Sequence, residues 1–242
     1  MKLTVFGNNA TCPEAGGACS CFLVETEGKR ILLDMGCGSL PRLQCQVDLA
    51  KLDLIVISHL HFDHFGDLFC AKYQLETRAA RGEKLRSITL CSPALPDWAA
   101  GELLSNGVFS HMTVADGGEY RLGPVELTFF RVPHLVESYA VRLRAEDKIF
   151  TYSGDSAACD ALTQAAWGAD CFLCEASLVD GQQSEAGHHL LAQQAGRIAA
   201  EAGAGQLLLT HYHSADSRQV LAQAGKQFPV ARLTRIGDSV MI

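Results

Sequence analysis

The sequence predicts one α/β domain folded as a four-layer αββα sandwich. Segments with strand and helix patterns occur in two similar series along the chain, as expected for two sheets that each carry helices. The 242 residues are 48% hydrophobic and 19% charged, a balance typical of a globular core. No linker rich in proline or serine and no low-complexity tract divides the chain. Residues 1–242 are therefore interpreted as a single domain.

The first series begins with short segments of high β preference and continues with helical patterns. Apolar and β-branched residues predict strands over residues 3–6, 21–26, 30–34 and 52–57. Helical spacing follows over residues 63–80 and 95–105.

The second series starts after Gly107 and repeats this order. Strands are predicted over residues 125–132, 139–143 and 149–152, and residues 145–148 form a hairpin loop between the last two. A buried strand over 171–175 comes next. The remaining pattern predicts a helix over 189–204, a buried strand over 206–210, a helix over 217–228 and a closing strand over 231–236.

The charge balance limits the partners of the chain. A formal net charge of -7 gives no general attraction to nucleic acid or to acidic membrane surfaces. An anionic substrate must therefore be held by a local positive site. The chain starts in a strand pattern without a cleavable hydrophobic stretch, and no run of about 18 apolar residues occurs. We expect a cytoplasmic protein with no membrane partner.

Ten cysteines are scattered through apolar segments. In a reducing compartment this distribution favours small buried hydrophobes, and no structural disulfide is expected. Cys171 and Cys174 form a CxxC pair inside a predicted strand, with no second cysteine pair nearby. A place in the core is favoured over metal binding for both residues.

A dense cluster of potential metal ligands follows the predicted strand over 52–57. His59, His61, Asp63 and His64 supply four ligands within six residues. A strand end followed by a helix start can direct His59 and His61 to one side and Asp63 and His64 to the other, toward two adjacent ions. Zinc is the expected metal, and manganese or ferrous iron accept the same ligand types. A solvated polar loop is the alternative, disfavoured because three of only nine histidines gather here.

Three further candidates stand at the ends of predicted apolar strands, namely His134, Asp155 and His211. Each alone is weak evidence, since a histidine at a strand end more often makes a hydrogen bond or faces solvent. Their common setting, together with the first cluster, favours ligation. Asp155 as a bridging carboxylate would complete a site for two ions about 3.5–4 Å apart.

The ligand order resembles that of the metallo-β-lactamase superfamily, and the resemblance spans nearly the whole chain. Within it, residues 133–142 and 152–156 are similar to the ribonuclease Z-like branch and its small phosphodiesterase-like hydrolases. The resemblance implies the metallo-β-lactamase fold and two divalent ions. It assigns His59, His61 and His134 to one ion, Asp63, His64 and His211 to the other, and Asp155 to both.

The resemblance also implies candidate catalytic residues. His189, expected to open a helix, would protonate the leaving group, and Glu175 would support it. The adjacent His188 is the alternative acid. Asp63 counts among the catalytic candidates as well as the ligands. Asp34 would orient a ligand histidine from behind, and a homodimer is a further implication.

These features predict a metal-dependent hydrolase that acts on a small phosphodiester or nucleotide through a metal-bound hydroxide. Two divalent ions with the carboxylates of Asp63 and Asp155 leave a charge of about +2, which suits a small anionic ester. Long nucleic acid is disfavoured as a partner. The hairpin over 145–148 replaces the long arm with which ribonuclease Z grips tRNA, and no basic cluster compensates. Processing of tRNA 3′ ends is thus a secondary alternative.

Other functions agree less well with the sequence. The same metals could hydrolyse a carboxylic ester, thioester, lactone or lactam. However, the export segment of a secreted β-lactamase and the Gly-His-Thr-Pro-Gly-His pattern of thioesterases and lactonases are both missing. Oxygen-reducing diiron relatives have glutamate where His61 stands. A non-enzymatic sensor or scaffold would be expected to lose metal ligands, and all seven are present.

Overall fold

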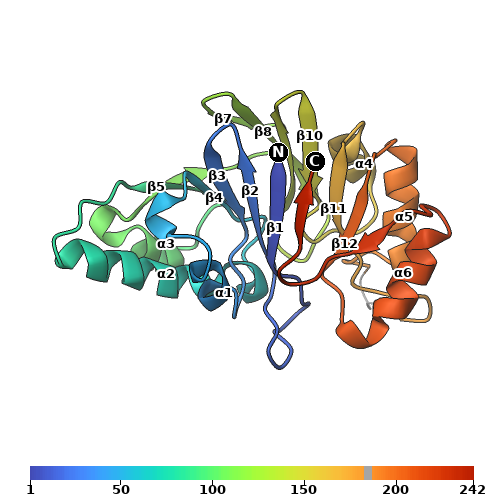
Figure 1. The fold of residues 1–242 in the computed structure, drawn as a ribbon, viewed down its shortest axis with the longest axis horizontal. Coiled ribbons are helices and arrows are strands. Elements are labelled where there is room, and N and C mark those ends of the chain that lie inside the picture. The colour runs from blue at the N-terminus through green and yellow to red at the C-terminus, as the bar shows by residue number, and fades with distance from the viewer. Residues whose placement is uncertain (183–186) are drawn as a thin grey trace.

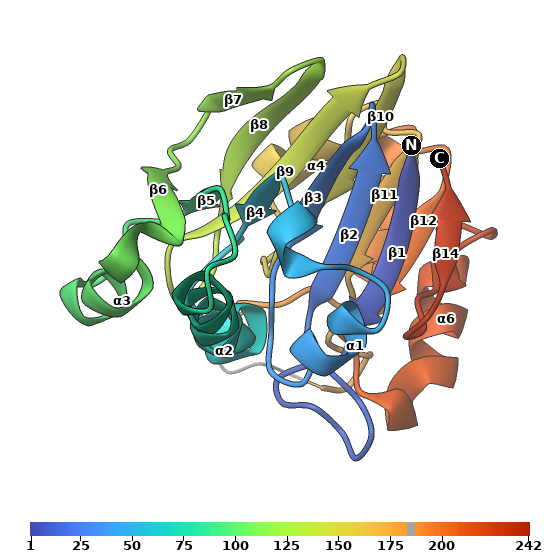
Figure 2. The ribbon, with the colours of Figure 1, turned by 60° about the vertical axis from the view of Figure 1, so that its left-hand side comes forward.

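The structure is a computed structural model that describes residues 1–182 and 187–242. Two seven-stranded sheets pack face to face, and helices cover the outer face of each (Figures 1 and 2). Helices α1 to α3 lie on the first sheet and α4 to α6 on the second (Figure 1). The predicted four-layer αββα sandwich is confirmed.

The first sheet has the strand order β14-β1-β2-β3-β4-β5-β6. Its strands are β1 (Lys2–Gly7), β2 (Cys21–Thr26), β3 (Lys29–Leu33), β4 (Leu54–Val56), β5 (Ile88–Ser92), β6 (Phe109–Thr113) and β14 (Ser239–Met241). Its helices are α1 (Leu40–Gln44), α2 (Phe62–Ala80) and α3 (Asp97–Leu103).

The second sheet has the order β13-β12-β11-β10-β9-β8-β7. Its strands are β7 (Glu119–Leu122), β8 (Val125–Val132), β9 (Ser138–Ala145), β10 (Lys148–Tyr152), β11 (Cys171–Glu175), β12 (Leu207–Thr210) and β13 (Arg232–Leu233). Its helices are α4 (Asp160–Ala166), α5 (Ala192–Glu201) and α6 (Ser217–Gly225).

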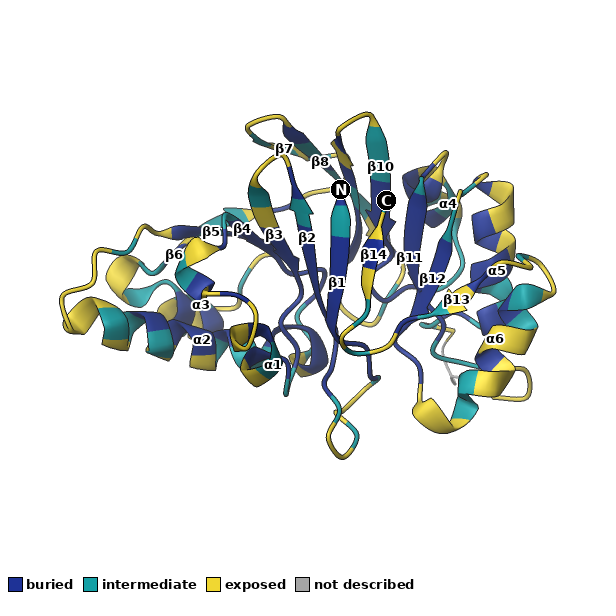
Figure 3. Ribbon diagram, viewed as in Figure 1, coloured by how far each residue is buried: buried dark blue, intermediate teal, exposed yellow. Residues whose placement is uncertain are grey.

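Strands buried on both faces explain the nearly continuous apolar runs in the sequence. Successive side chains of a strand point to opposite faces. In β2, Phe22 and Val24 enter the core between the sheets, whereas Cys21 and Leu23 pack under the helices of the first sheet. Figure 3 shows the same division, with buried strands inside and exposed residues on the outer faces of the helices.

Parallel pairing brings the candidate ligands to one edge of the sandwich. Strands β3 to β6 are mutually parallel in the first sheet, as are β10 to β13 in the second. His59 follows β4, Asp155 follows β10 and His211 follows β12. Open α/β sheets bind ligands beyond the carboxyl ends of their parallel strands, and the candidate site lies there.

The helix predicted over 189–204 is shorter at both ends, because α5 begins at Ala192 and ends at Glu201. Residues 190 and 191 are held in extended form by Leu178, whose N–H donates to the Leu190 carbonyl and whose carbonyl accepts from the Ala192 N–H. His189 therefore precedes α5, and the expectation that it opens a helix is wrong.

The predicted closing strand over 231–236 is also wrong in its extent. Only Arg232–Leu233 pair in the second sheet as β13. The chain then turns through Gly237, at a φ of 95°, and returns to the first sheet as β14 beside β1. Six helices and strands of the described residues had no range in the sequence prediction, namely α1, β5, β6, β7, α4 and β14.

All ten cysteines are free, and five of them are buried. Cys171 points into the core between the sheets, whereas Cys174 points into the layer under the helices. Opposite directions prevent the CxxC pair from binding one metal ion, so its interpretation as core filling is confirmed. Burial raises the pKa of Cys171 to about 12.

The predicted hairpin loop is present between β9 and β10. Its central residues Glu146 and Asp147 have φ values of 54° and 56°, as in the two-residue turns that join antiparallel strands tightly. Among the helices of the described residues, none has the length and apolar character to cross a membrane.

Candidate metal centre

The structure brings all seven predicted ligands together in two adjacent groups. One group contains His59, His61 and His134, and the other contains Asp63, His64, Asp155 and His211. Within each group the potential ligand atoms all lie within 4.8 Å of one another. Residues from both halves of the chain meet here, as the sequence predicts.

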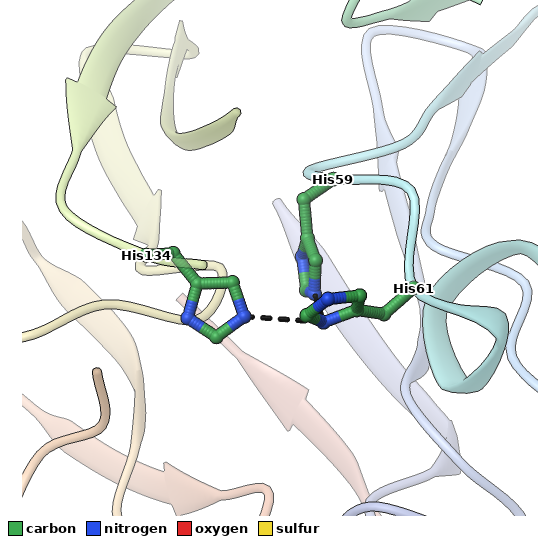
Figure 4. A group of neighbouring side chains, drawn as sticks. All are labelled: His59, His61 and His134. Carbon is green, nitrogen blue, oxygen red and sulfur yellow. Dashed lines mark hydrogen bonds between the residues drawn. The ribbon is translucent and has the colours of Figure 1, made fainter. Parts of the chain in front are cut away.

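The first group presents three imidazole nitrogens to one point. His61 Nδ1 lies 3.1 Å from His59 Nε2 and 3.2 Å from His134 Nε2 (Figure 4). Two ligands about 2.1 Å from a tetrahedral zinc ion are about 3.4 Å apart, so this spacing fits a shared ion. His59 is fixed by a β-bridge to Ser138, which joins the end of β4 to the start of β9.

The second group has comparable spacing. His211 Nε2 lies 3.3 Å from both His64 Nε2 and Asp63 Oδ2. Asp155 Oδ2 is 3.4 Å from His211 Nε2 and 3.7 Å from His59 Nε2. The Asp155 carboxylate therefore lies between the two groups, as a bridging ligand must.

A buried acceptor at Asp155 fits a bound cation. Its Oδ1 accepts no hydrogen bond from the described residues, although His64 Nε2 lies 3.4 Å away. Buried polar atoms nearly always have a partner, and a metal ion would supply one here. Burial favours the neutral acid, but the electrostatic effect of the neighbouring His211, His64 and His59 outweighs it and holds the pKa of Asp155 well below its usual range.

Partners behind the ligand histidines fix their orientation. His211 Nδ1 lies 2.8 Å from Ser177 Oγ, His134 Nδ1 donates to the His188 carbonyl at 3.0 Å, and His59 Nδ1 lies 3.1 Å from Ser58 Oγ. Such contacts leave the other ring nitrogen directed at the centre, as in known metal sites. Burial also lowers the pKa of His59 and His134 and favours the neutral imidazole that metals bind.

Asp34 contacts His64 on the side of the ring that faces away from the centre. Its Oδ2 lies 2.7 Å from His64 Nδ1 and also accepts the hydroxyls of Ser58 and Tyr152 at 2.8 and 2.7 Å. The Ser58 N–H donates to Oδ1 at 2.7 Å. Burial disfavours a charge on His64, but Asp155 and Asp34 together raise its pKa well above the ordinary value.

His189 lies at the edge of the centre and contacts a buried carboxylate. Its Nδ1 is 3.0 Å from Glu175 Oε1 and 3.9 Å from Asp155 Oδ2. Glu175, at the end of β11, also accepts from the Ser156 N–H at 2.8 Å and the Ser177 hydroxyl at 2.5 Å. Burial opposes protonation of His189, but the hydrogen bond and charge of Glu175 raise its pKa to about 9.

His189 and His188, adjacent in sequence, occupy different positions. His189 belongs to two of the ligand-like groups around the centre, one with His134 and Asp155 and one with Glu175 and His211. His188 contributes its backbone carbonyl, which accepts from His134. The geometry therefore places the His189 side chain beside the centre.

Three residues that support the centre were not predicted from the sequence, namely Ser58, Tyr152 and Ser177. Ser177 connects Glu175 to His211 through its hydroxyl. Its position two residues after Glu175 in the sequence was only a weak indication of this supporting role. Tyr152 reaches Asp34 across 118 positions of sequence, and no local pattern could indicate that contact.

The fold and the site define a metal-dependent hydrolase of the αββα class. A family model described as "Beta-lactamase superfamily domain" matches residues 29–212, more than half of the chain. The chain belongs to the metallo-β-lactamase superfamily, and the resemblance found in the sequence is confirmed.

Individual relatives agree with this assignment. The chain is 29% identical over 217 residues to the probable metallo-hydrolase YhfI of Bacillus subtilis, covering 87% of this chain and 86% of that protein. The crystal structure of YhfI superimposes with a TM-score of 0.93 at 26% identity, over 99% and 98% of the two chains. A ribonuclease Z from Ignicoccus hospitalis is 25% identical over 288 residues, covering 94% of each chain. A diphosphatase of the PhnP family has the same fold, with a TM-score of 0.77 at 18% identity over 100% and 97% of the chains.

Proposed function

We propose that this chain is a phosphodiesterase that uses two divalent ions, with zinc as the expected metal, to hydrolyse a small phosphodiester or nucleotide. One observation carries the proposal. The Asp155 carboxylate lies between two groups of ligands, and His189, held by buried Glu175, stands 3.9 Å from it.

The charge of the site favours an anionic substrate. Two divalent ions and the carboxylates of Asp63 and Asp155 sum to about +2. The chain as a whole carries -7, so this positive charge is local. A phosphodiester carries one negative charge and would bind at the centre without requiring a basic surface elsewhere.

Bound at these ligands, the ions would activate a water nucleophile and stabilise the charge that develops on the attacked group. The protein residues would hold and move protons around this step. Glu175 binds Nδ1 of His189, which leaves Nε2 to protonate the departing oxygen. With a pKa of about 9, His189 carries the required proton at neutral pH.

The short β9–β10 hairpin favours a small substrate over tRNA. Two residues, Glu146 and Asp147, connect the strands, so no arm extends from this position. The relative from Ignicoccus hospitalis is a ribonuclease by name, and RNA is itself a phosphodiester. The shared chemistry supports diester cleavage by this chain.

A substrate panel tests the proposal. Zinc-loaded protein should hydrolyse bis-p-nitrophenyl phosphate, whereas a lactam, a lactone and a thioester should show little or no turnover. His189→Ala should lower the rate on a dinucleoside monophosphate, whose leaving alkoxide needs a proton, by about 10²- to 10³-fold, as expected for loss of a general acid. The same variant should affect bis-p-nitrophenyl phosphate less, because p-nitrophenolate leaves without a proton. His213→Ala is the matched control, because His213 is an exposed histidine outside the ligand groups. Turnover of a carbonyl substrate without any phosphodiester hydrolysis would contradict the proposal.

A further inference from the structure

We propose that Phe62 and Trp98 form a surface that stacks against a planar aromatic group, such as a nucleobase, on the substrate arm retained after cleavage. This inference rests on the proposed phosphodiesterase function. It assigns a specificity role to exposed residues that the reaction itself does not use. The surface, called the aromatic platform below, consists of Phe62, Phe69 and Trp98, with Phe65 packed beneath it.

The platform is unusually exposed for large aromatic side chains. Phe62 is 62% exposed and Trp98 is 56% exposed. Their rings are ordered by contacts with one another. Phe62 lies parallel to the buried Phe65 at 5.5 Å between centroids and 14° between planes, and Phe69 lies parallel to Trp98 at 5.8 Å and 16°. Phe62 and Trp98 are 6.3 Å apart. Clustered exposed apolar groups on a soluble domain commonly mark a binding surface.

The platform adjoins the metal centre through the chain itself. Phe62 stands between the ligands His61 and Asp63, at the first position of α2. The start of this helix is fixed, because the His64 N–H donates to the His61 carbonyl and the His64 carbonyl accepts from the Met35 N–H. A group stacked on Phe62 would then lie beside the helix start that carries the ligands Asp63 and His64.

The platform and His189 belong to opposite sides of the molecule. Phe62 and Trp98 come from α2 and α3 on the first sheet, whereas His189 precedes α5 on the second sheet (Figure 1). Since His189 serves the leaving oxygen, the arm that lies toward α2 and α3 is the one that stays on the phosphate. The aromatic group is accordingly assigned to the retained arm.

Stacking, without ion pairing, is the recognition chemistry that these rings provide. Every nucleobase has a flat π surface, and loss of one aromatic stacking partner lowers affinity by about 5- to 150-fold. A base bound in this way would be recognised by its planar shape with little dependence on its identity.

Two chromogenic diesters that differ only in the retained arm test the inference. Thymidine 5′-(p-nitrophenyl phosphate) and methyl p-nitrophenyl phosphate share the same leaving group. The ratio of their kcat/KM values should favour the thymidine ester. Phe62→Ala and Trp98→Ala should each lower that ratio by about 5- to 150-fold, and Phe62→Tyr should restore it. The control is Trp167→Ala, which removes a 66% exposed tryptophan from the end of α4 and should leave the ratio unchanged.

Tryptophan fluorescence supplies a readout that is independent of turnover. The chain has two tryptophans, so Trp167→Phe leaves Trp98 as the sole tryptophan. In that background, thymidine 5′-phosphate should quench the emission and ribose 5-phosphate should not. Adding Phe62→Ala should weaken the quenching by about the factor seen in the kinetic ratio.

The outcomes separate this inference from the function on which it rests. If the protein hydrolyses neither diester, the phosphodiesterase proposal is contradicted. The fluorescence experiment would then test the aromatic platform by itself. Hydrolysis of both esters with equal kcat/KM would overturn the aromatic platform but not the phosphodiesterase proposal. A kcat/KM ratio unaffected by Phe62→Ala would have the same meaning. The platform would also be overturned if Phe62→Ala converted a dimer to a monomer in sedimentation velocity without changing the ratio, since the face would then join two copies of the chain.

Discussion

Several ligand histidines of the centre are oriented by partners on the side away from it. Asp34 shows this arrangement most clearly, because one buried carboxylate contacts His64, Ser58 and Tyr152. Its position before the ligand cluster was readable from the sequence, whereas the tyrosine contact depends on how the two sheets pack and was not.

Asp34→Ala should weaken zinc binding by about 10- to 100-fold, because His64 loses the contact that orients its ring. The variant should also unfold at a lower temperature, since the buried Ser58 and Tyr152 hydroxyls lose their acceptor. Competition with a chromophoric chelator measures the affinity. Asp116→Ala, which removes an aspartate outside the ligand groups, is the control. Zinc affinity equal to that of the unmodified protein would rule out this role of Asp34.

The pH dependence of turnover should report on His189. Because it must be protonated to act as an acid, kcat should fall as the pH rises through about 9. Protonation also stabilises the folded protein, fully below the ordinary pKa of 6.5, and this stabilisation is lost as the pH rises through about 9.

Glu175→Gln tests the cause of the raised pKa. Without the carboxylate charge, the main cause that raises the pKa of His189 is lost, and the basic limb of the kcat profile should move to lower pH. A limb that stays in place in Glu175→Gln, or that persists unchanged in His189→Ala, would show that another group titrates.

At the scale of elements, the sequence predicted well those segments in which a single hydrophobic pattern, of either strand or helix type, runs from end to end. Strand β2 was placed at its observed bounds, and α2 within one residue, because continuous burial and helical spacing marked them. The start of α5 was misplaced, since alanine favours a helix locally while Leu178 holds residues 190 and 191 extended. Strand β14 was missed because only its pairing with distant β1 defines it.

The cysteines offer a test of the strand directions. Alkylation of the folded protein should modify the exposed Cys12, Cys45 and Cys70 first. Cys21 and Cys174 should react only after unfolding, because burial raises the pKa of both thiols and excludes the reagent. Peptide mass spectrometry after iodoacetamide treatment identifies the sites. Labelling of Cys174 at the rate of Cys12 would contradict the placement of β11.

At the scale of the whole molecule, the centre joins the two halves of the sandwich. His59 and His64 come from the first half of the chain, whereas Asp155 and His211 come from the second. The order of these residues along the sequence is sufficient to indicate the superfamily. The aromatic platform was not predicted, because Phe62 and Trp98 meet only when α2 and α3 pack together.

Removal of metal should therefore lower global stability. Ligand at 100 times its dissociation constant stabilises a folded protein by about 2.7 kcal/mol, which corresponds to roughly 5–10 °C in Tm for a domain of this size. Calorimetry before and after treatment with a chelator measures the difference, and zinc added back should restore the original Tm. An identical Tm at verified zero and full metal content would show that the ligands do not hold ions across the two halves.

The most direct test of the phosphodiesterase account is the rate of bis-p-nitrophenyl phosphate hydrolysis by Asp155→Ala, compared with the unmodified protein at equal, verified zinc content. We predict turnover by the unmodified protein and a loss of at least about 10²-fold in the variant, because the Asp155 carboxylate lies between both ligand groups. Equal turnover by the fully metallated variant would contradict the account.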